Sequence, residues 1–222
     1  HFNHLVENDV WNHAIYSRLL RGWTGVPVVV GDRQGTPEVE LGLRQSQTGR
    51  ERLFGALAAI SSRWSKPGDG LLYATALPLA DELRLQLRLG QWPRLCVSRP
   101  CPEAVVNPSM RAWTLTPKDS EDIFEKIACC LIAHQLPRVY LEGYRDLLSA
   151  AGDLTWPDEP AFVWTSYAHI TDEVFKVWAA EKSEAGSPLV IGQHGGTAQA
   201  LFNGQREHGN RIADHRLTFG PA

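Results

Sequence analysis

Apolar and polar residues follow their clearest pattern between positions 161 and 203 of the 222-residue chain. The short apolar runs at 161–164 and 188–191 have the length and composition of strands that are buried on both faces of a parallel sheet. Four apolar residues between these runs recur at the spacing of one helix face: Val174, Phe175, Trp178 and Ala179. The segment therefore predicts a strand–helix–strand unit of an α/β protein.

The ends of the central helix are marked by polar residues and by glycine. Thr171 is the expected N-cap, because Asp172 and Glu173 then lie in the first turn, where negative charge is favourable. Gly186 is expected to end the helix. Polar loops follow both strands, so both loops should lie at the same edge of the sheet.

These two loops predict a ligand site, since open α/β sheets bind ligands beyond the carboxyl ends of their strands. Its expected residues are Thr165, Ser166 and His169 after the first strand, and Gln193, His194, Gly195 and Gly196 after the second. His194 is the strongest candidate for chemistry, because a neutral imidazole accepts a proton and the following glycines free backbone amides to bind an anion. The alternative is a tight turn that requires glycine and carries two solvated histidines.

Weaker patterns predict the remaining elements. Helices are expected at 9–19, 81–90, 123–136 and 138–150. A further helix is expected to begin at a Thr48–Glu51 capping box and to carry Leu53, Leu57, Ile60 and Trp64 at helical spacing. Strands are expected at 26–30, 71–75 and 211–219, with a short one near 112–115 inside an irregular segment, 91–117. Residues 81–90 also alternate like a strand, but most of them are good helix formers. Residues 152–160 are expected to form a proline-containing linker, and residues 204–210 are polar.

Composition limits the class of protein. The 22 basic and 25 acidic residues give a net charge of −3 and form no basic cluster suited to nucleic acid. No apolar run approaches the roughly 20 residues that span a bilayer, so no transmembrane segment is expected. The four cysteines, Cys96, Cys101, Cys129 and Cys130, lack C-x-x-C spacing, so the sequence predicts a reduced, cytoplasmic protein without a zinc site.

Three motifs in the strand–helix–strand segment together resemble a family of transferases found in bacterial surface-polysaccharide loci. They are W-T-S-x-A-H at 164–169, D-E-V-F-K-x-W-A-A-E-K at 172–182 and P-L-V-I-G-Q-H-G-G at 188–196. The resemblance extends from about residue 156 to residue 202. P-R-V-Y-L-E-G-Y at 137–144 and W-N-H-x-I-Y at 11–16 are similar to more N-terminal blocks of the same family.

The resemblance implies a parallel-sheet, Rossmann-like lobe of a two-lobed, GT-B-type glycosyltransferase. Residues 1–160 would form the N-terminal, acceptor-side α/β lobe, and residues 161–222 a βαβ unit whose Q-H-G-G loop lies at the lobe junction. Because the chain does not begin with methionine, we expect it to be a fragment that lacks the second lobe. That lobe normally carries most nucleotide contacts, so the fragment alone is expected to be inactive.

The implied function is transfer of a sugar from a nucleotide-activated donor to a surface polysaccharide or a lipid-linked glycan, without a cofactor. Peripheral association with a membrane is compatible with such an acceptor. No D-x-D motif stands in a loop after a predicted strand, which favours metal-independent transfer. Two alternatives stay open: a non-catalytic carbohydrate- or nucleotide-binding module, and a transferase of phosphoalditol units of cell-surface polymers.

The resemblance also assigns roles to residues. His194 would be catalytic, as a general base or as a phosphate ligand, and the alternative is a histidine that holds the turn. The substrate-binding residues would be Gln193, Gly195, Gly196, Thr165, Ser166, His169, Glu142, Asn12 and His13. Glu142 is otherwise expected to be a solvated helix residue, and Asn12 and His13 to be helix-surface or packing residues. The chain has Thr197-Ala198-Gln199 where the family pattern is roughly H-Y-G, so donor or acceptor identity is expected to differ.

Overall fold

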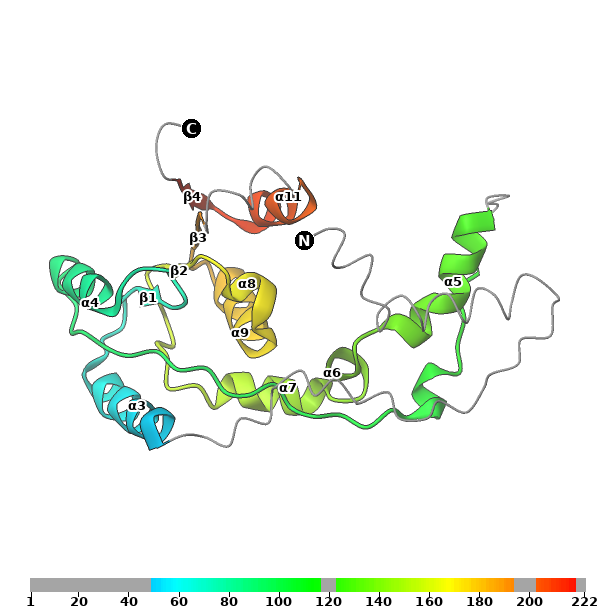
Figure 1. Ribbon diagram of the computed structural model, residues 1–222, viewed down its shortest axis with the longest axis horizontal. Helices are drawn as coiled ribbons and strands as arrows, with labels where there is room; N and C mark the ends of the chain where they lie inside the picture. Colours follow the sequence, from blue (N-terminus) through cyan, green and yellow to red (C-terminus); the bar gives the residue numbers. More distant parts are fainter. Residues whose placement is uncertain (1–48, 117–122, 194–202, 219–222) are drawn as a thin grey trace. The chain divides into compact units, whose positions relative to one another are not determined.

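The computed structural model describes residues 49–116, 123–193 and 203–218, which form two compact units (Figure 1). The first unit contains residues 104–116 and 123–142 of the described chain, and the second contains 49–103, 143–193 and 203–218. The helix predicted at 9–19 and the strand predicted at 26–30 lie outside the described residues.

The second unit is built on a parallel sheet of four strands in the order β1-β2-β3-β4. The strands are β1 (Leu71–Leu72), β2 (Val163–Thr165), β3 (Leu189–Gly192) and β4 (His215–Leu217). Val163 lies opposite Leu71 on one side and opposite Leu189 on the other. The predicted parallel sheet is therefore confirmed, although β1, β2 and β4 are shorter than the predicted segments. Because β1 pairs with β2, the sheet combines residues from both sides of position 160.

Helices and aromatic side chains cover the sheet. The second unit contains α7 (Tyr144–Gly152), α8 (Ala168–Thr171) and α9 (Glu173–Glu184), and both α7 and α8 pack against α9. The apolar stripe predicted for α9 is confirmed, since its four members are all buried: Val174, Phe175, Trp178 and Ala179. Trp156, from the non-helical segment before β2, places its ring 4.8 Å from Tyr73 and 5.0 Å from Trp178. This aromatic cluster closes the core between strand ends and helix.

Asp172, and not Thr171, is the N-cap of α9. One carboxylate oxygen of Asp172 accepts a hydrogen bond from the Phe175 amide at 2.9 Å, and the other accepts one from the Tyr73 hydroxyl at 2.8 Å. Burial and the Asp172 carboxylate both raise the pKa of Tyr73, so this hydroxyl remains a donor. The C-terminus is as predicted: Gly186 adopts φ +99° and its amide bonds to the Ser183 carbonyl.

Buried polar side chains join the N-terminal helices of this unit to the sheet. These helices are α3 (Gly49–Ser61), the 3₁₀ turn η1 (Ser62–Trp64) and α4 (Leu79–Arg88), which confirms both helix predictions. Arg94 donates to the Gly70 carbonyl at 2.8 Å and to the Ser65 hydroxyl, and its backbone amide donates to Gln86 Oε1 at 2.8 Å. The segment after α4 is thereby fixed between η1 and the start of β1.

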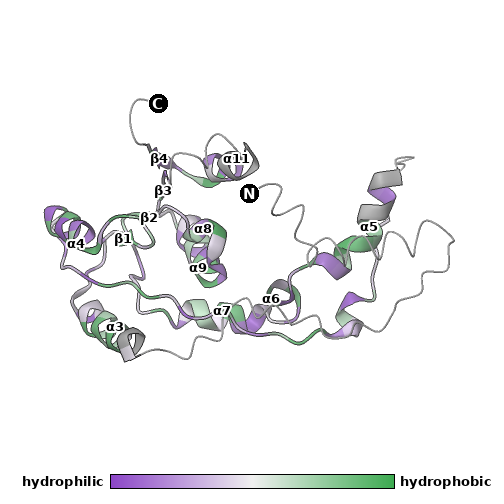
Figure 2. Ribbon diagram, viewed as in Figure 1, coloured by the Kyte–Doolittle hydropathy of each residue, from purple (hydrophilic) through white to green (hydrophobic). Residues whose placement is uncertain are grey.

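The stripe of α3, in contrast, is not in the core. Leu53, Leu57, Ile60 and Trp64 keep the predicted helical spacing, yet each of these side chains is exposed. Ala58, on the opposite side of the helix, is the buried apolar residue of α3 among those whose side chains are described. Figure 2 shows hydrophobic colouring along the middle of this exposed helix.

Two further predictions are corrected, and one helix was not predicted. Residues 112–115 form no strand; they follow the 3₁₀ turn η2 (Pro108–Arg111), where Asn107 caps the turn through its side chain. The helix expected at 138–150 is broken between α6 (Arg138–Leu141) and α7, because Glu142 turns toward Arg111. The polar segment 204–210 lies within a helix, α11 (Asn203–Ile212), whose Gly209 is buried close to Ile191 and His169.

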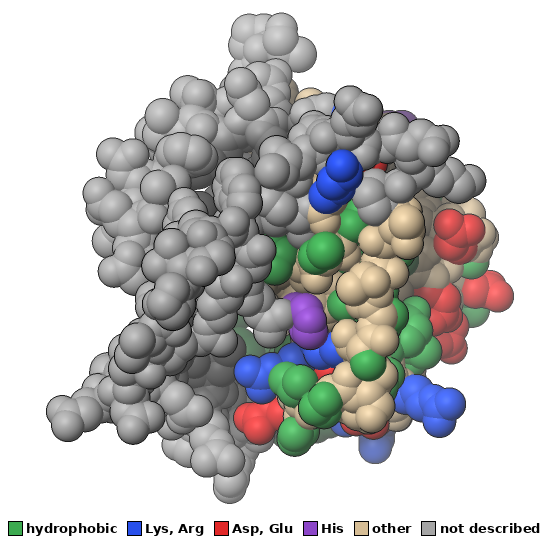
Figure 3. All heavy atoms as spheres, turned by 90° about the vertical axis from the view of Figure 1, so that its right-hand side faces the viewer, with side chains coloured by type: hydrophobic (Ala, Val, Ile, Leu, Met, Phe, Trp, Pro, Cys, Tyr) green, Lys and Arg blue, Asp and Glu red, His purple; other side chains and the backbone are tan. Residues whose placement is uncertain are grey.

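The described residues were also compared with the expectations for membrane-spanning segments, surface charge and cysteines. Within them, no helix is long and apolar enough to cross a membrane. On the face in Figure 3, basic and acidic side chains both lie among hydrophobic ones. All four cysteines are described and are free: Cys96, Cys101, Cys129 and Cys130.

The Asp172 cap gives a test of the fold. Asp172→Ala removes a helix cap and leaves the Tyr73 hydroxyl without its acceptor, so the free energy of unfolding should fall by about 2 kcal/mol. Thr171→Ala, one residue away, should change it by less than about 0.5 kcal/mol. Urea unfolding of both variants measures the difference. Equal losses would place the cap at Thr171 and contradict the structure.

Candidate functional site

The carboxyl ends of the four parallel strands lie at one edge of the sheet, which we call the carboxyl edge. Residues 73–78 follow β1, residues 166–172 follow β2, and Gln193 follows β3. Backbone bonds extend beyond the strands: the Ser166 amide donates to the Ala74 carbonyl at 2.9 Å and the Gln193 amide to the Leu217 carbonyl at 2.8 Å. Because Thr165 of β2 lies opposite Ile191 of β3, the loops predicted to converge from these two strands start from adjacent positions.

Thr165 and Ser166 are buried at this edge, and their hydroxyl groups are engaged with the backbone. Thr165 Oγ1 accepts a bond from the Ala168 amide at 3.0 Å, which starts α8. Ser166 Oγ donates to the Thr75 carbonyl at 2.7 Å. Each hydroxyl thus fixes the course of a loop, and the predicted contact of these two residues with a ligand stays a prediction.

Gly192 allows β3 to pass close to the loop after β2. A Cβ atom at this position would lie 2.5 Å from Ser166 Oγ and 2.8 Å from Trp164 Nε1, both closer than real Cβ contacts. The Trp164 indole N–H is buried and has no hydrogen-bond partner in the described part of the chain. A glycine is therefore required where the backbone leaves β3 toward position 194.

The loop after β1 has a strained backbone. Ala74 and Ala76 adopt φ values of +53° and +63°, and left-handed backbone in a residue with a Cβ costs about 1–2 kcal/mol. Thr75, between them, is buried and donates from its hydroxyl to Glu82 Oε2 at 2.6 Å. Burial raises the pKa of Glu82, and the Thr75 hydrogen bond opposes that rise. Strain of this kind is often found at ligand sites, and sequence reasoning missed it because it took 71–75 as a strand.

His169 lies on α8 at the carboxyl edge and is 7% exposed. Its Nε2 atom is near α11, since a Cβ atom on Gly209 would be 3.5 Å away. Its Nδ1 atom is buried and has no partner among the described residues. Burial, together with the nearby His208, Lys176 and Arg216, lowers the pKa of His169 to about 4, so its imidazole is neutral near pH 7.

The predicted catalytic residue, His194, lies outside the described residues, as do Gly195, Gly196, Asn12 and His13. Gln193 is described, is partly buried, and is fixed through its backbone at the end of β3. The structure thus brings together Thr165, Ser166, His169 and Gln193 at one edge. It leaves the roles of all these residues as predictions.

Glu142 belongs to the first unit and forms a buried ion pair. Arg111 donates from Nε to Glu142 Oε1 at 2.5 Å and from Nη2 to Oε2 at 2.6 Å, and the two side chains are 6% and 5% exposed. These bonds from Arg111 are the largest factor that lowers the pKa of Glu142, to about 2. The expectation of a solvated Glu142 is therefore wrong. The pair was not foreseeable from sequence, because its members are 31 positions apart.

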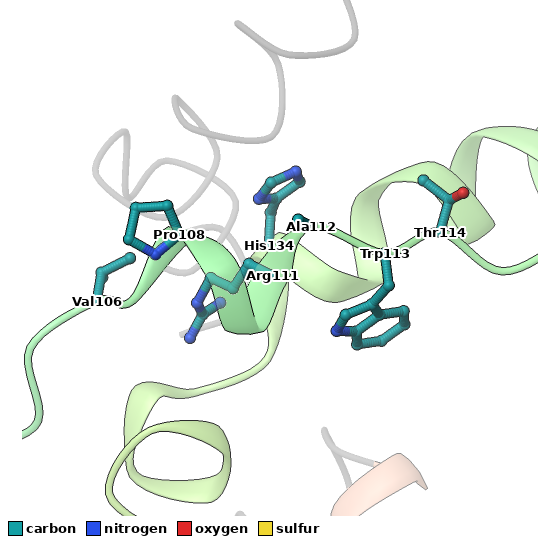
Figure 4. A pocket seen from close by; sticks show the side chains of 7 residues that line it. All are labelled: Val106, Pro108, Arg111, Ala112, Trp113, Thr114 and His134. Carbon is teal, nitrogen blue, oxygen red and sulfur yellow. The ribbon is translucent and has the colours of Figure 1, made fainter.

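A hollow of about 550 Å³ lies beside this ion pair in the first unit. It is lined by Val106, Pro108, Arg111, Ala112, Trp113, Thr114 and His134. Figure 4 shows the Arg111, Trp113 and His134 side chains pointing in different directions. Arg111 also donates to the Ala133 and Leu136 carbonyls, so its guanidinium holds η2 against α5 (Ile123–Gln135).

A resident metal was not expected, and the described residues contain no group of three His, Cys, Asp or Glu side chains that could hold one. This finding does not decide the reaction, and metal independence remains a prediction.

The close approach at Gly192 can be tested by a double-mutant cycle. Gly192→Ala should lower the free energy of unfolding by about 2 kcal/mol, because the new methyl group overlaps Ser166 and Trp164. Ser166→Ala in the same chain should recover about 0.5–1 kcal/mol, since one of the two overlaps is removed. Gly55→Ala, where no atom lies within 4 Å, is the matched control and should not destabilise the chain. If Gly192→Ala were as stable as the wild type, β3 would not pass as close to Ser166 and Trp164 as the structure shows.

The buried His169 predicts how stability depends on pH. Its pKa is lowered from about 6.5 to about 4 in the folded chain, so as the pH falls the unfolded chain binds the proton first. Stability is therefore complete above pH 6.5 and is lost as the pH falls toward 4. Between pH 7 and pH 5 the wild type should lose about 1 kcal/mol more than His169→Gln in urea unfolding. Parallel pH curves for the two proteins would show that His169 is not buried in its neutral form.

Comparison with known proteins gives one match, to a family model. No curated protein and no solved structure matches the chain. A family model described as LIC12162 family transferase matches residues 1–221, which is nearly the whole sequence. The chain is therefore a member of the LIC12162 family of transferases.

Proposed function

We propose that the chain is part of a glycosyltransferase that moves a sugar from a nucleotide-activated donor to a surface polysaccharide or a lipid-linked glycan. The observation that carries the proposal is the adjacency of β2 and β3. These parallel neighbours carry the W-T-S and P-L-V-I-G-Q motifs, and Ser166 and Gln193 follow them at one edge. Membership of a transferase family supports group transfer as the type of reaction.

In this proposal His194 is the general base that takes the proton from the acceptor hydroxyl. In the sequence His194 comes two residues after Gly192, where β3 ends against the buried Ser166. The amides of Gly195 and Gly196 would stabilise negative charge on the donor phosphates, as backbone donors do in other anion sites. Gln193 would bind a sugar hydroxyl. The chemistry would then need no metal and no cofactor.

The buried hydroxyl groups have a different role in this proposal from the one that the motif alone suggests. Thr165 and Ser166 would hold the loops in place, because both hydroxyls already bond to backbone groups. His169, neutral and buried between α8 and α11, would position the same edge without transferring a proton. Loops fixed in this way keep catalytic groups within the narrow range of geometry that transfer requires. We place this reaction in the cytoplasm, where nucleotide-activated sugars would be bound.

The test is a thermal-shift screen of the full-length gene product against nucleotides and nucleotide sugars. At a concentration 100-fold above Kd, the true donor should stabilise the protein by about 2.7 kcal/mol, which raises Tm by several degrees. His194→Ala should keep that shift and lose transfer by at least about 100-fold, the usual contribution of a general base. His215→Ala, at an exposed histidine of β4, is the matched control and should retain activity.

Two results would overturn the proposal. If no nucleotide raised Tm at saturation, the protein would not use a nucleotide-activated donor. Full transfer activity in His194→Ala would show that His194 is not the general base, although the claim about the donor would still hold.

A further inference from the structure

A second hollow, of about 540 Å³, lies in the second unit away from the carboxyl edge. One wall comes from η1 and the residues that follow it, and the other comes from residues 154–159. These two segments precede β1 and β2, which are parallel neighbours. Both walls therefore approach the sheet at the strand ends opposite to the carboxyl edge, and we call this space the amino-edge hollow. Its volume is within the range of roughly 300–1,000 Å³ of small-molecule sites.

Hydrogen bonds fix the two walls of the amino-edge hollow. The Gly68 amide donates to the Glu159 carbonyl at 3.0 Å, which joins one wall to the other. The Lys66 amide donates to Asp69 Oδ2 at 2.9 Å, which closes the turn before β1. Because the walls are held in place before a ligand arrives, little conformational entropy would be lost on binding.

Three donor groups at the hollow have no acceptor in the described part of the chain. Trp156 lines the hollow and is 6% exposed, and its buried indole N–H has no hydrogen-bond partner there. Ser65 Oγ accepts a bond from Arg94, so the proton of this hydroxyl remains available to a ligand. The Lys66 ammonium forms no ion pair with any described residue. An unsatisfied buried donor costs free energy, so a ligand that accepts from it gains stability.

Asp158 and Glu159 supply acceptors at the same hollow. Both residues are exposed, and within the described ranges neither carboxylate forms an ion pair. Each ionised carboxylate accepts several hydrogen bonds, and bonds to a charged group are stronger than those between neutral groups. The hollow thus presents donors and acceptors that the chain itself does not use.

This combination of groups selects one class of ligand. Two carboxylates repel an anion such as a phosphate, and the Lys66 ammonium repels a metal cation. An amino acid zwitterion would pair with Lys66 and one carboxylate, and would leave the second carboxylate, the Ser65 hydroxyl and the indole N–H unmatched. A sugar carries several hydroxyl groups, each of which donates one bond and accepts others, so it matches all of these groups together.

We propose that the amino-edge hollow binds a neutral saccharide. Hydroxyl groups of the saccharide donate to the Asp158 and Glu159 carboxylates. They accept from the Lys66 ammonium, the Ser65 hydroxyl and the Trp156 indole N–H. This site lies at the opposite strand ends from the carboxyl edge and does not depend on the proposed transfer reaction.

Saturation-transfer NMR titration of the 222-residue chain tests the site. The probes are four neutral disaccharides: maltose, cellobiose, lactose and N,N′-diacetylchitobiose. At least one of them should bind with a Kd at or below about 1 mM. About 0.5 M NaCl should leave this Kd unchanged, because a neutral ligand has no net charge for salt to screen.

Variants of the hollow assign the binding to it. Asp158→Ala and Lys66→Ala should each weaken binding of the saccharide by about tenfold, since each removes a charged hydrogen-bond partner. Glu184→Ala is the matched control, because Glu184 is an exposed acidic residue of α9 and does not line the hollow. The Tm of all three variants should match that of the wild type, since each substituted side chain is exposed.

Three outcomes would overturn the proposal. None of the four disaccharides binds, or one binds but Asp158→Ala and Lys66→Ala bind it as well as Glu184→Ala does, which would place the sugar elsewhere. Alternatively, the chain binds glutamine and no disaccharide, and the hollow would then recognise a zwitterion. The nucleotide screen with His194→Ala does not involve the hollow, so the two proposals fail independently.

Discussion

The second unit depends on covering strands that are too short to be stable alone. β1 has two residues and β2 has three, so the sheet contributes few hydrogen bonds and depends on the burial of β1, β2 and β3, whereas β4 is largely exposed. The cover comes from α9 and from the aromatic cluster around Trp156. Asp172 links the two, because its carboxylate caps α9 and also binds the Tyr73 hydroxyl beside β1. The cap of α9, the aromatic core and the end of β1 therefore depend on one another through Asp172.

At the carboxyl edge, too, single side chains take part in several contacts. Thr75 follows β1, Ser166 follows β2 and Gly192 is the last residue of β3. The Ser166 hydroxyl, bonded to the Thr75 carbonyl, leaves room only for a glycine at position 192. The left-handed alanines on either side of Thr75 show that this connection is held in a conformation that the isolated chain would avoid. A platform of this kind is suited to fixing the start of the loop at position 194, whichever ligand that loop serves.

The sequence predicts what is periodic and local, and it fails where a residue depends on a distant partner. The stripe of α9 could be read from spacing alone. Its cap could not, because the acceptor role of Asp172 depends partly on Tyr73, 99 positions away. For the same reason the pattern of α3 gave the correct face but not its exposure. Ser166 was correctly placed after a strand, but only the structure shows that the Thr75 carbonyl uses its hydroxyl. The helix α11 was missed because its residues are polar and include two glycines, and packing near His169 overrides that low propensity.

The backbone bonds that continue past the strand ends have a consequence for motion. The amides of Ser166 and Gln193 lie just outside β2 and β3, yet Ser166 bonds to the Ala74 carbonyl after β1 and Gln193 to the Leu217 carbonyl at the end of β4. Slow hydrogen exchange should therefore extend beyond the sheet itself, up to the residue that precedes position 194. A ligand that reaches the carboxyl edge would meet a backbone that is already ordered, and little conformational entropy would be lost there on binding.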